Sequence, residues 1–242
     1  MNIALYQDLW ELEEKHWWHI SKRELCQKVI AKYFKGGKIV DIGCGTGKNV
    51  EAFSKYGEVW GIDNSEEALK FCKKRGLNNV IKGDAEKSNL PGKTFKLVTL
   101  LDVLEHTDDT KTLKEIHRIL KKDGLLLITV PSYQWMFSQW DVVLHHKRRY
   151  TKGKLEELLK KNGYEIVFSS YFQSFLVLPV FVIRRLKSAL KPKNYGSDFR
   201  LGNQFINRLL LKVSHAEQQT VMRHGLPFGL SILALARKRR LS

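Results

Sequence analysis

The stretch Lys38–Gly47, KIVDIGCGTG, decides the fold of this chain. A short apolar run ends there in three glycines, and apolar residues at helical spacing come next. That order predicts a buried strand over 38–42 that turns sharply into a helix over 47–56. Glycine is needed at such a turn because a Cβ atom would hinder a positive φ angle or the close approach of a ligand.

A carboxylate after the next strand links this turn to nucleotide recognition. Asp63 follows the apolar run 59–62, roughly 20 residues past the first glycine, where nucleotide-binding sheets place a ribose-binding carboxylate. The glycine spacing is G-x-G-x-G, however, and not the G-x-G-x-x-G of dinucleotide sites. Asp41, two residues before the first glycine, is a poor neighbour for a phosphate but suits the amino group and sulfonium of S-adenosylmethionine. These features disfavour an NAD-dependent dehydrogenase.

Four segments together resemble the motif series of class I S-adenosylmethionine-dependent methyltransferases, those with a type 11/12-like domain. They are DIGCGTG at 41–47, GIDNS at 61–65, GDAEKSNLP at 83–91 and FKLVTLLDVLEH at 95–106. Their order and spacing match the family over about residues 36–131. The resemblance implies S-adenosylmethionine as cofactor and S-adenosylhomocysteine as product. It also implies an α/β fold with a Rossmann-like, seven-stranded, mostly parallel sheet sandwiched by helices.

The remaining pattern divides the chain into a cap and a catalytic domain. We expect an N-terminal helical cap over 1–36 and a methyltransferase domain over 37–242, with a basic and aromatic lid insertion at about 171–226 before the last strand. Alternation of apolar runs with amphipathic segments predicts the elements. Strands are expected over 38–42, 58–62, 79–82, 95–101, 124–130, 164–170 and 228–236, and helices near 5–34, 47–56, 65–75, 109–121, 151–163 and 204–218.

The cofactor residues are assigned from strand ends and from the resemblance. Ligands of parallel sheets bind at the carboxyl ends of the strands. Asp63 is expected to accept hydrogen bonds from both ribose hydroxyls, and Asp84 one from the adenine amino group. Trp17 or Trp18 is expected to close over the pocket; the alternative is that one of them packs on the sheet and the other is half-exposed. Arg23 would bind both oxygens of the methionine carboxylate at once. The expected cofactor-binding set is Trp18, Arg23, Asp41, Gly43, Cys44, Gly45, Gly47, Asp63, Asn64, Asp84, Ala85, Leu101, Asp102 and Val103.

The loop over 132–150 follows the fifth expected strand and therefore opens on the same edge. It combines aromatic residues with HHKRR at 145–149, a mixture that suits an anionic, partly apolar acceptor. The alternative is a loop that packs its aromatics on the sheet beside a solvated charge run. The H-x-R-R-Y pattern also resembles a subset of these methyltransferases. His106, His145 and His146 are the candidate general bases, because imidazole titrates near neutral pH.

No metal site is expected. The three cysteines at 26, 44 and 72 lack C-x-x-C spacing, which indicates a reducing compartment without structural zinc. The N-terminal segment is acidic and helical and does not resemble a signal peptide. The sequence therefore predicts a cytoplasmic protein, with membrane association left open.

Charge is distributed unevenly along the chain. Residues 1–130 hold 22 Lys and Arg against 19 Asp and Glu, whereas residues 131–242 hold 20 against 6. Such an excess fits a phosphorylated, lipid-linked or glycan-linked anionic acceptor, peripheral contact of 171–190 with an anionic membrane, or RNA. The alternative for 171–190 is a helix packed over the substrate site. Methylation of base amino groups is disfavoured because LDVLEH, not an Asn-Pro-Pro-Tyr motif, follows the fourth strand. A non-catalytic cofactor-binding protein and a merely solvated surface remain alternatives.

Overall fold

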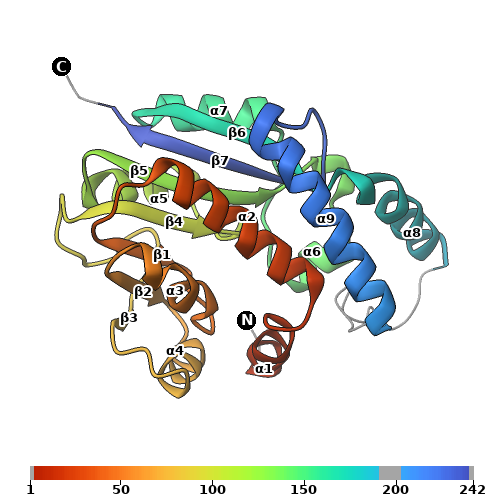
Figure 1. Ribbon diagram of the computed structural model, residues 1–242, viewed down its shortest axis with the longest axis horizontal. Coiled ribbons are helices and arrows are strands. Elements are labelled where there is room, and N and C mark those ends of the chain that lie inside the picture. Colours follow the sequence, from red (N-terminus) through yellow and green to blue (C-terminus); the bar gives the residue numbers. More distant parts are fainter. Residues whose placement is uncertain (1–2, 191–202, 240–242) are drawn as a thin grey trace.

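The chain folds around one seven-stranded sheet with helices on both faces (Figure 1). The computed structural model describes residues 3–190 and 203–239, except for the side chains of 3–5 and 184–190. The strand order is β3-β2-β1-β4-β5-β7-β6, in which β7 runs antiparallel to both neighbours and the other pairs are parallel. The strands are β1 (Ile39–Ile42), β2 (Val59–Asp63), β3 (Val80–Lys82), β4 (Phe95–Leu101), β5 (Leu120–Pro131), β6 (Tyr164–Phe172) and β7 (Ser231–Lys238). This confirms the expected fold class.

Two apolar cores, one on each face, hold the sheet between its helices. One contains side chains of α5 and α7, and the other contains side chains of α2, α3, α4 and α9. Burial of these apolar surfaces is the main favourable contribution to folding. The helices are α1 (Ile3–Leu12), α2 (Trp17–Tyr33), α3 (Lys48–Phe53), α4 (Glu66–Lys74), α5 (Asp109–Ile119), α6 (Gln139–Val143), α7 (Lys152–Lys161), α8 (Val177–Leu190) and α9 (Gln204–His224). Short 3-10 turns lie at Ser54–Tyr56 (η1), Leu104–His106 (η2), Gln134–Met136 (η3) and Ser174–Leu176 (η4).

Several helices begin where the sequence predicts a capping residue. The Ser65 hydroxyl accepts a hydrogen bond from the Ala68 amide at 3.4 Å at the start of α4. The Asp108 carboxylate accepts bonds from the amides of Thr110 and Lys111 at 3.0 and 3.1 Å at the start of α5. Such caps satisfy amides that have no partner within the helix. The parallel strands and their helices are therefore set largely by local sequence.

The connection between the last two strands differs in detail from the expectation. The inserted segment spans 173–230, because β6 continues to Phe172 and β7 begins only at Ser231. Helix α9 continues to His224 rather than ending near 218. Residues 191–202 of the inserted segment lie outside the described residues, as do the tail after 239 and the side chains of Arg184, Arg185 and Lys187 within the segment 171–190.

The N-terminal cap and the inserted segment pack against each other, which the sequence does not reveal. Helices α2 and α9 lie side by side over one face of the sheet (Figure 1). The Gln218 amide donates to the Ser21 carbonyl at 2.8 Å and accepts from Lys28 at 2.7 Å. Near the other end, Asn207 accepts from the Trp17 amide at 2.9 Å. These contacts join segments about 190 residues apart into one cover.

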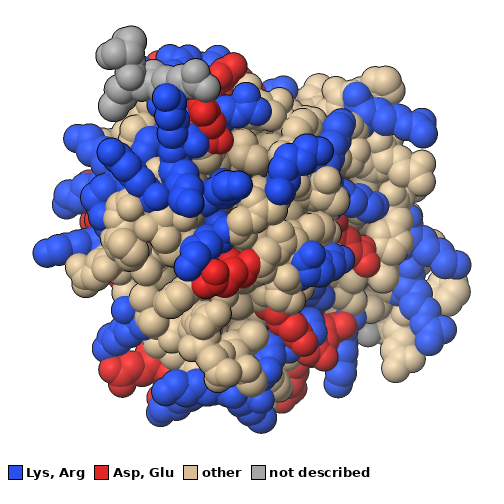
Figure 2. All heavy atoms as spheres, turned by 60° about the vertical axis from the view of Figure 1, so that its left-hand side comes forward, with Lys and Arg blue, Asp and Glu red and all other residues tan. Residues whose placement is uncertain are grey.

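Basic side chains are spread over the face that lies at the left of Figure 1. Figure 2 shows Lys and Arg scattered across this face, with fewer Asp and Glu among them. The amino ends of the parallel strands lie on this side (Figure 1), away from the carboxyl ends where ligands of such sheets bind. Part of the basic excess is therefore solvated surface. Within the described residues, no helix is long and apolar enough to cross a membrane.

Candidate functional site

The glycine turn after β1 has the backbone geometry that the sequence predicts. Gly43, Gly45 and Gly47 all have positive φ angles, of 73°, 54° and 86°. A Cβ atom on Gly43 would lie 2.4 Å from Val103, and one on Gly47 would lie 2.5 Å from Leu77. The first and third glycines are thus required for packing within the chain as well as for φ. A Cβ on Gly45 would meet nothing nearer than a methyl group of α1 at 3.4 Å.

Two buried carboxylates flank this turn. The Asp63 oxygens accept hydrogen bonds from the amides of Gly45 at 2.9 Å and Ser65 at 3.0 Å, so the side chain also holds the turn in place. Asp41 accepts a bond from Thr99, and its second oxygen is buried with no partner among the described residues. Burial raises the pKa of Asp63 and raises that of Asp41 to about 7. A cationic group that entered here would meet an unsatisfied carboxylate.

Three residues of the expected cofactor-binding set, Asn64, Asp84 and Ala85, follow the carboxyl ends of β2 and β3. Asn64 and Asp84 are exposed, while Ala85 is half-buried against the core. One Asp84 oxygen accepts a hydrogen bond from the Glu86 amide at 2.7 Å and thereby shapes its own loop. Neither exposed side chain is locked by a distant contact, which leaves both accessible to a ligand.

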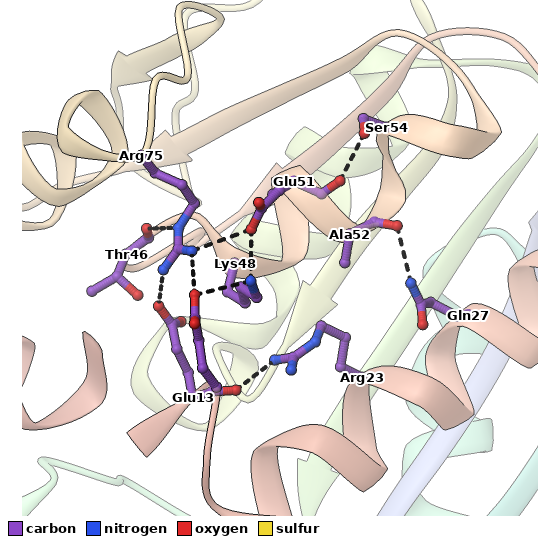
Figure 3. A network of polar contacts seen from close by, with 10 residues as sticks. Glu13, Arg23, Gln27, Thr46, Lys48, Glu51, Ala52, Ser54 and Arg75 are labelled. Carbon is purple, nitrogen blue, oxygen red and sulfur yellow. Dashed lines mark hydrogen bonds and ion pairs between the residues drawn. The ribbon is translucent and has the colours of Figure 1, made fainter. Parts of the chain in front are cut away.

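Helix α1 covers the glycine turn and is tied down by an ionic network (Figure 3). Arg75 is almost fully buried and donates to Glu13 at 2.5 Å, to Glu14 at 2.8 Å and to the Thr46 carbonyl at 3.2 Å. Glu51 also joins Arg75, at 3.2 Å. Arg75 and Lys48 hold the pKa of Glu14 at about 2. The segment after α1 is thereby fixed to the turn itself.

Trp18 and Arg23 lie on α2, but their contacts are with the cap. The Arg23 guanidinium donates to the Glu13 carbonyl at 2.9 Å (Figure 3). Trp17 is buried and contacts Phe175 of the inserted segment, with ring centroids 6.1 Å apart. Trp18 is half-buried beside Trp17. Trp17 thus packs against the inserted segment, and the cofactor roles of Trp18 and Arg23 stay predictions.

The end of β4 carries the next cluster of expected residues. Leu101 is buried, Val103 packs on Gly43, and Asp102 has a positive φ angle of 56°. The Asp102 carboxylate is paired with Lys22 of α2 and accepts from Thr129 at 2.8 Å. Although burial opposes both charges, this pairing lowers the pKa of Asp102 and raises that of Lys22. Sequence analysis missed Lys22, since it lies 80 residues away.

Beside this pair, two of the three candidate histidines come together with a buried glutamate. The rings of His106 and His146 lie 4.8 Å apart, and Nε2 of His146 is 4.0 Å from Glu105 Oε1. His146 Nδ1 lies 2.8 Å from Asp141, and His106 Nδ1 lies 3.3 Å from the carbonyl oxygen of His145. Burial lowers the pKa of His106 to about 4 and raises that of Glu105 well above its usual range. The exposed His145 side chain does not join this group.

Most basic side chains of the 132–150 loop form ion pairs with carboxylates of this chain. Arg149 binds the fully buried Asp141 through Nη2 at 2.7 Å and Nε at 2.8 Å, and Arg148 binds Asp109 at 2.6 Å. Although burial opposes its charge, Asp141 has a lowered pKa because His146 and Arg149 surround it. Lys147 is exposed. Sequence analysis missed Glu105 and Asp141. The basic run HHKRR could have indicated them, because such a run needs acidic partners where it is buried.

A methyltransferase-domain family matches residues 40–128, the segment that carries β1 to β5. A demethylmenaquinone methyltransferase of Geobacillus stearothermophilus is 37% identical over 114 residues, which are 43% of this chain and 49% of that protein. The matched part therefore spans about half of that relative. An uncharacterised protein of Methanocaldococcus jannaschii is 26% identical over 66% of this chain and 72% of its own length.

Solved structures show the same fold. A SAM-dependent methyltransferase from Archaeoglobus fulgidus superposes with a TM-score of 0.57 at 22% identity, covering 89% of this chain and 94% of that one. The phosphoethanolamine N-methyltransferase 2 of Haemonchus contortus, in complex with S-adenosyl-L-methionine, gives 0.58 at 20% identity over 90% and 52% of the two chains. Together with the motif series, these findings confirm the predicted class I, S-adenosylmethionine-dependent methyltransferase domain.

Proposed function

We propose that this chain, which carries a class I methyltransferase domain, methylates an anionic small molecule, either free or linked to a lipid or glycan. The observation that carries the proposal is the juxtaposition at one sheet edge. The glycine turn and Asp63 form one part of this edge, and the group of Glu105, His106 and His146 follows the next strand in the sheet. The first part suits the cofactor, and the second suits the acceptor.

The reaction is an in-line displacement. A lone pair of the acceptor attacks the methyl carbon while the carbon–sulfur bond breaks, and its electrons stay on sulfur as a neutral thioether. Such reactions gain chiefly from alignment and from exclusion of water. Helix α1 and the paired α2 and α9 supply the cover that excludes water. In this proposal the group that contains His106 and His146 lies beside the acceptor.

Aromatic side chains of the same 132–150 loop support an acceptor with an apolar part. Tyr133 and Trp135 stack with centroids 5.3 Å apart, and Trp135 contacts Phe181 of α8 at 5.5 Å. Trp135 nevertheless remains 56% exposed. An aromatic ring held in place yet open to solvent offers a contact surface for a chain or a sugar.

The cations available for an anionic group are fewer than the sequence indicates. Since Arg148 and Arg149 are bound to carboxylates, Lys147 is the exposed cation of this loop, within the described residues. Arg208 and Lys212 of α9 are also exposed. We therefore propose that Lys147 contacts the acceptor's anionic group.

A membrane contact fits the same acceptor class. Helix α8 packs one side on the protein through Phe181 and exposes Leu178, Val182 and Ile183. Helix α9 exposes an apolar stripe that contains Phe205 and Leu209 near its exposed cations. Apolar side chains flanked by cations are typical of helices that lie at an anionic membrane surface. We propose that the expected membrane contact of 171–190 includes α9 as well.

Binding to vesicles tests this contact. The wild-type protein should sediment with vesicles that contain anionic lipid, and the double variant Phe205→Ser, Leu209→Ser should sediment markedly less. The variant removes exposed apolar side chains only, so its folding should be unchanged. Equal sedimentation of both proteins would show that α9 does not take part in the membrane contact.

Transfer of labelled methyl groups tests the proposed function itself. The protein is incubated with S-adenosylmethionine labelled in its methyl group and with separate pools of lipid-linked, glycan, small anionic and RNA acceptors. Label is expected in one of the first three pools, and Asp63→Ala should transfer less of it when S-adenosylmethionine is limiting. Label in RNA would instead establish an RNA methyltransferase, whose binding should weaken steeply with salt. Cofactor binding without any transfer would favour a non-catalytic protein.

A further inference from the structure

Three side chains beside the proposed acceptor position form a group that is unlike the rest of the site. Glu105 and His106 come from η2, after β4, and His146 comes from the loop before α7. Their nearest donor atoms all lie within 4.8 Å of one another. Donors on one metal ion, each about 2.1 Å from it, lie about 3 to 3.5 Å apart. Small side-chain rotations would therefore bring all three onto a common ion.

Hydrogen bonds already orient both imidazoles for this role. The Asp141 carboxylate lies 2.8 Å from Nδ1 of His146, and the carbonyl oxygen of His145 lies 3.3 Å from Nδ1 of His106. Since a carbonyl can only accept, the His106 Nδ1 carries the proton. Each ring is thereby left with an Nε2 lone pair as its free donor. Metal-binding histidines usually have this arrangement, in which a carboxylate or carbonyl holds the other nitrogen.

The loop contacts that bring the third ligand into place are built into the fold. The Lys147 amide donates to the Glu105 carbonyl at 2.8 Å, so the loop is joined to η2 beside the group. Asp141 is fully buried and is held by Arg149 at 2.7 Å. The position of His146 is thus fixed on both sides.

Glu105 provides the independent observation. Its side chain is fully buried, and neither carboxylate oxygen has a hydrogen-bond partner among the described residues. A carboxylate taken out of water without a partner is costly to the fold. A bound cation would supply the missing partner.

We propose that Glu105, His106 and His146 bind a divalent transition-metal ion at the acceptor side of the site. Two imidazoles and one carboxylate on one face of an ion are typical of sites for metals such as Mn²⁺, Fe²⁺, Co²⁺ or Zn²⁺, with coordination positions left open. This replaces the general-base role of the two histidines and the expectation that the chain has no metal site.

The role of the ion rests on the proposed function. An acceptor hydroxyl bound at an open position would release its proton to solvent more easily, because the cation stabilises the oxyanion. That oxygen then attacks the methyl carbon, and the carbon–sulfur bond electrons pass to sulfur. Such a metal site therefore favours an acceptor that is methylated on oxygen.

Cobalt binding tests the site without reference to methyl transfer. Untagged protein is dialysed against a chelator and titrated with Co²⁺, with visible absorption and calorimetry as readouts. One ion per chain is expected, with absorption bands of nitrogen and oxygen ligands. Glu105→Gln and His146→Ala should each weaken binding at least tenfold, whereas His145→Ala, at the exposed neighbouring histidine, should leave it unchanged.

Binding of S-adenosylhomocysteine to the same variants separates the two proposals. Burial raises the pKa of Glu105 well above its usual range, so Glu105→Gln replaces a carboxyl group that is neutral without metal by a neutral amide of similar volume. The variant should therefore fold and bind S-adenosylhomocysteine as the wild type does. Absence of Co²⁺ binding by the wild type, or equal binding by Glu105→Gln and His146→Ala, would overturn the metal site. Neither result would affect cofactor binding, on which the proposed function depends.

Discussion

The two halves of the site edge are built in different ways. On the cofactor side, the buried Asp63 carboxylate accepts hydrogen bonds from two backbone amides, those of Gly45 in the glycine turn and of Ser65, two residues further along the chain. On the acceptor side, partners come from distant segments, as Lys22 does for Asp102 and Asp141 for His146. That side also retains a carboxylate, Glu105, that has no hydrogen-bond partner among the described residues.

The difference shows which constraints each half obeys. A turn that must bring backbone close to a ligand is specified by local glycine geometry, although Asp41 beside it keeps one oxygen without a hydrogen-bond partner among the described residues. A part that acts on a variable acceptor is assembled from side chains held by charge pairs across the fold. We therefore expect substitutions on the acceptor side to affect stability more, and those on the cofactor side to affect affinity for the cofactor more.

The largest expected effect is on the acceptor side. Asp141→Ala leaves the guanidinium of Arg149, whose side chain is 7% exposed, without its buried partner. Loss of one partner of a buried ion pair typically costs about 3–5 kcal/mol. Denaturant unfolding should show a decrease of that size, whereas Glu157→Ala, at an exposed pair with Lys161, should change stability by less than about 0.5 kcal/mol. Similar small effects of both would mean that the acceptor loop is not held by this pair.

Removal of Arg75 should affect one region selectively. Arg75→Ala takes away the bonds that fix the segment after α1 to the glycine turn. The buried Glu13 then loses its charge partner, and the free energy of unfolding should fall by about 2–3 kcal/mol. Hydrogen exchange should become faster in α1 but not in β4, because local opening needs only the cap to detach. Uniform acceleration across both elements would contradict the idea of a separately attached cap. Lys82→Ala, at an exposed pair, is the control.

A cofactor-side carboxylate should affect affinity directly. Asp63→Ala removes the expected ribose contact and weakens S-adenosylhomocysteine binding by about 1–3 kcal/mol. Calorimetry measures this change, with Glu58→Ala, an exposed carboxylate on the amino side of β2, as the matched control. Unchanged affinity of Asp63→Ala would place the cofactor elsewhere.

A further effect is a pH dependence of stability at Asp41. Burial raises the pKa of this acid to about 7, so the folded chain holds a proton that the unfolded chain releases near pH 4. Stability is therefore lost as pH rises from about 4 to about 7, and Asp41→Asn should escape this loss. Across this range, the free energy of unfolding of Asp41→Asn should rise relative to that of the wild type by at least about 1.4 kcal/mol, the equivalent of one pKa unit. Parallel pH profiles would show that Asp41 is not buried as an acid.

Much of the cofactor side could be predicted from sequence because its signals are local. The glycine spacing, Asp63 and the capping residues each act within a few positions of the backbone that they shape. The parallel order of β1 to β5 followed from the alternation of strands and helices. The cofactor roles of individual side chains remain predictions.

The acceptor side was less accessible because its contacts link distant residues. No periodicity pairs Lys22 with Asp102, or α2 with α9. The HHKRR segment was interpreted by its charge, yet folding pairs Arg148 and Arg149 with carboxylates. Glu105 precedes a candidate histidine in sequence, but its burial depends on the whole loop packed over it.

The central claim is that the edge formed by the glycine turn and Asp63 binds S-adenosylmethionine. Calorimetric titration of the full chain with S-adenosylhomocysteine, with NAD as the control, tests it most directly. We predict binding of one S-adenosylhomocysteine per chain, weakened by Asp63→Ala, and no binding of NAD. Absence of S-adenosylhomocysteine binding, or binding of NAD in its place, would contradict the claim.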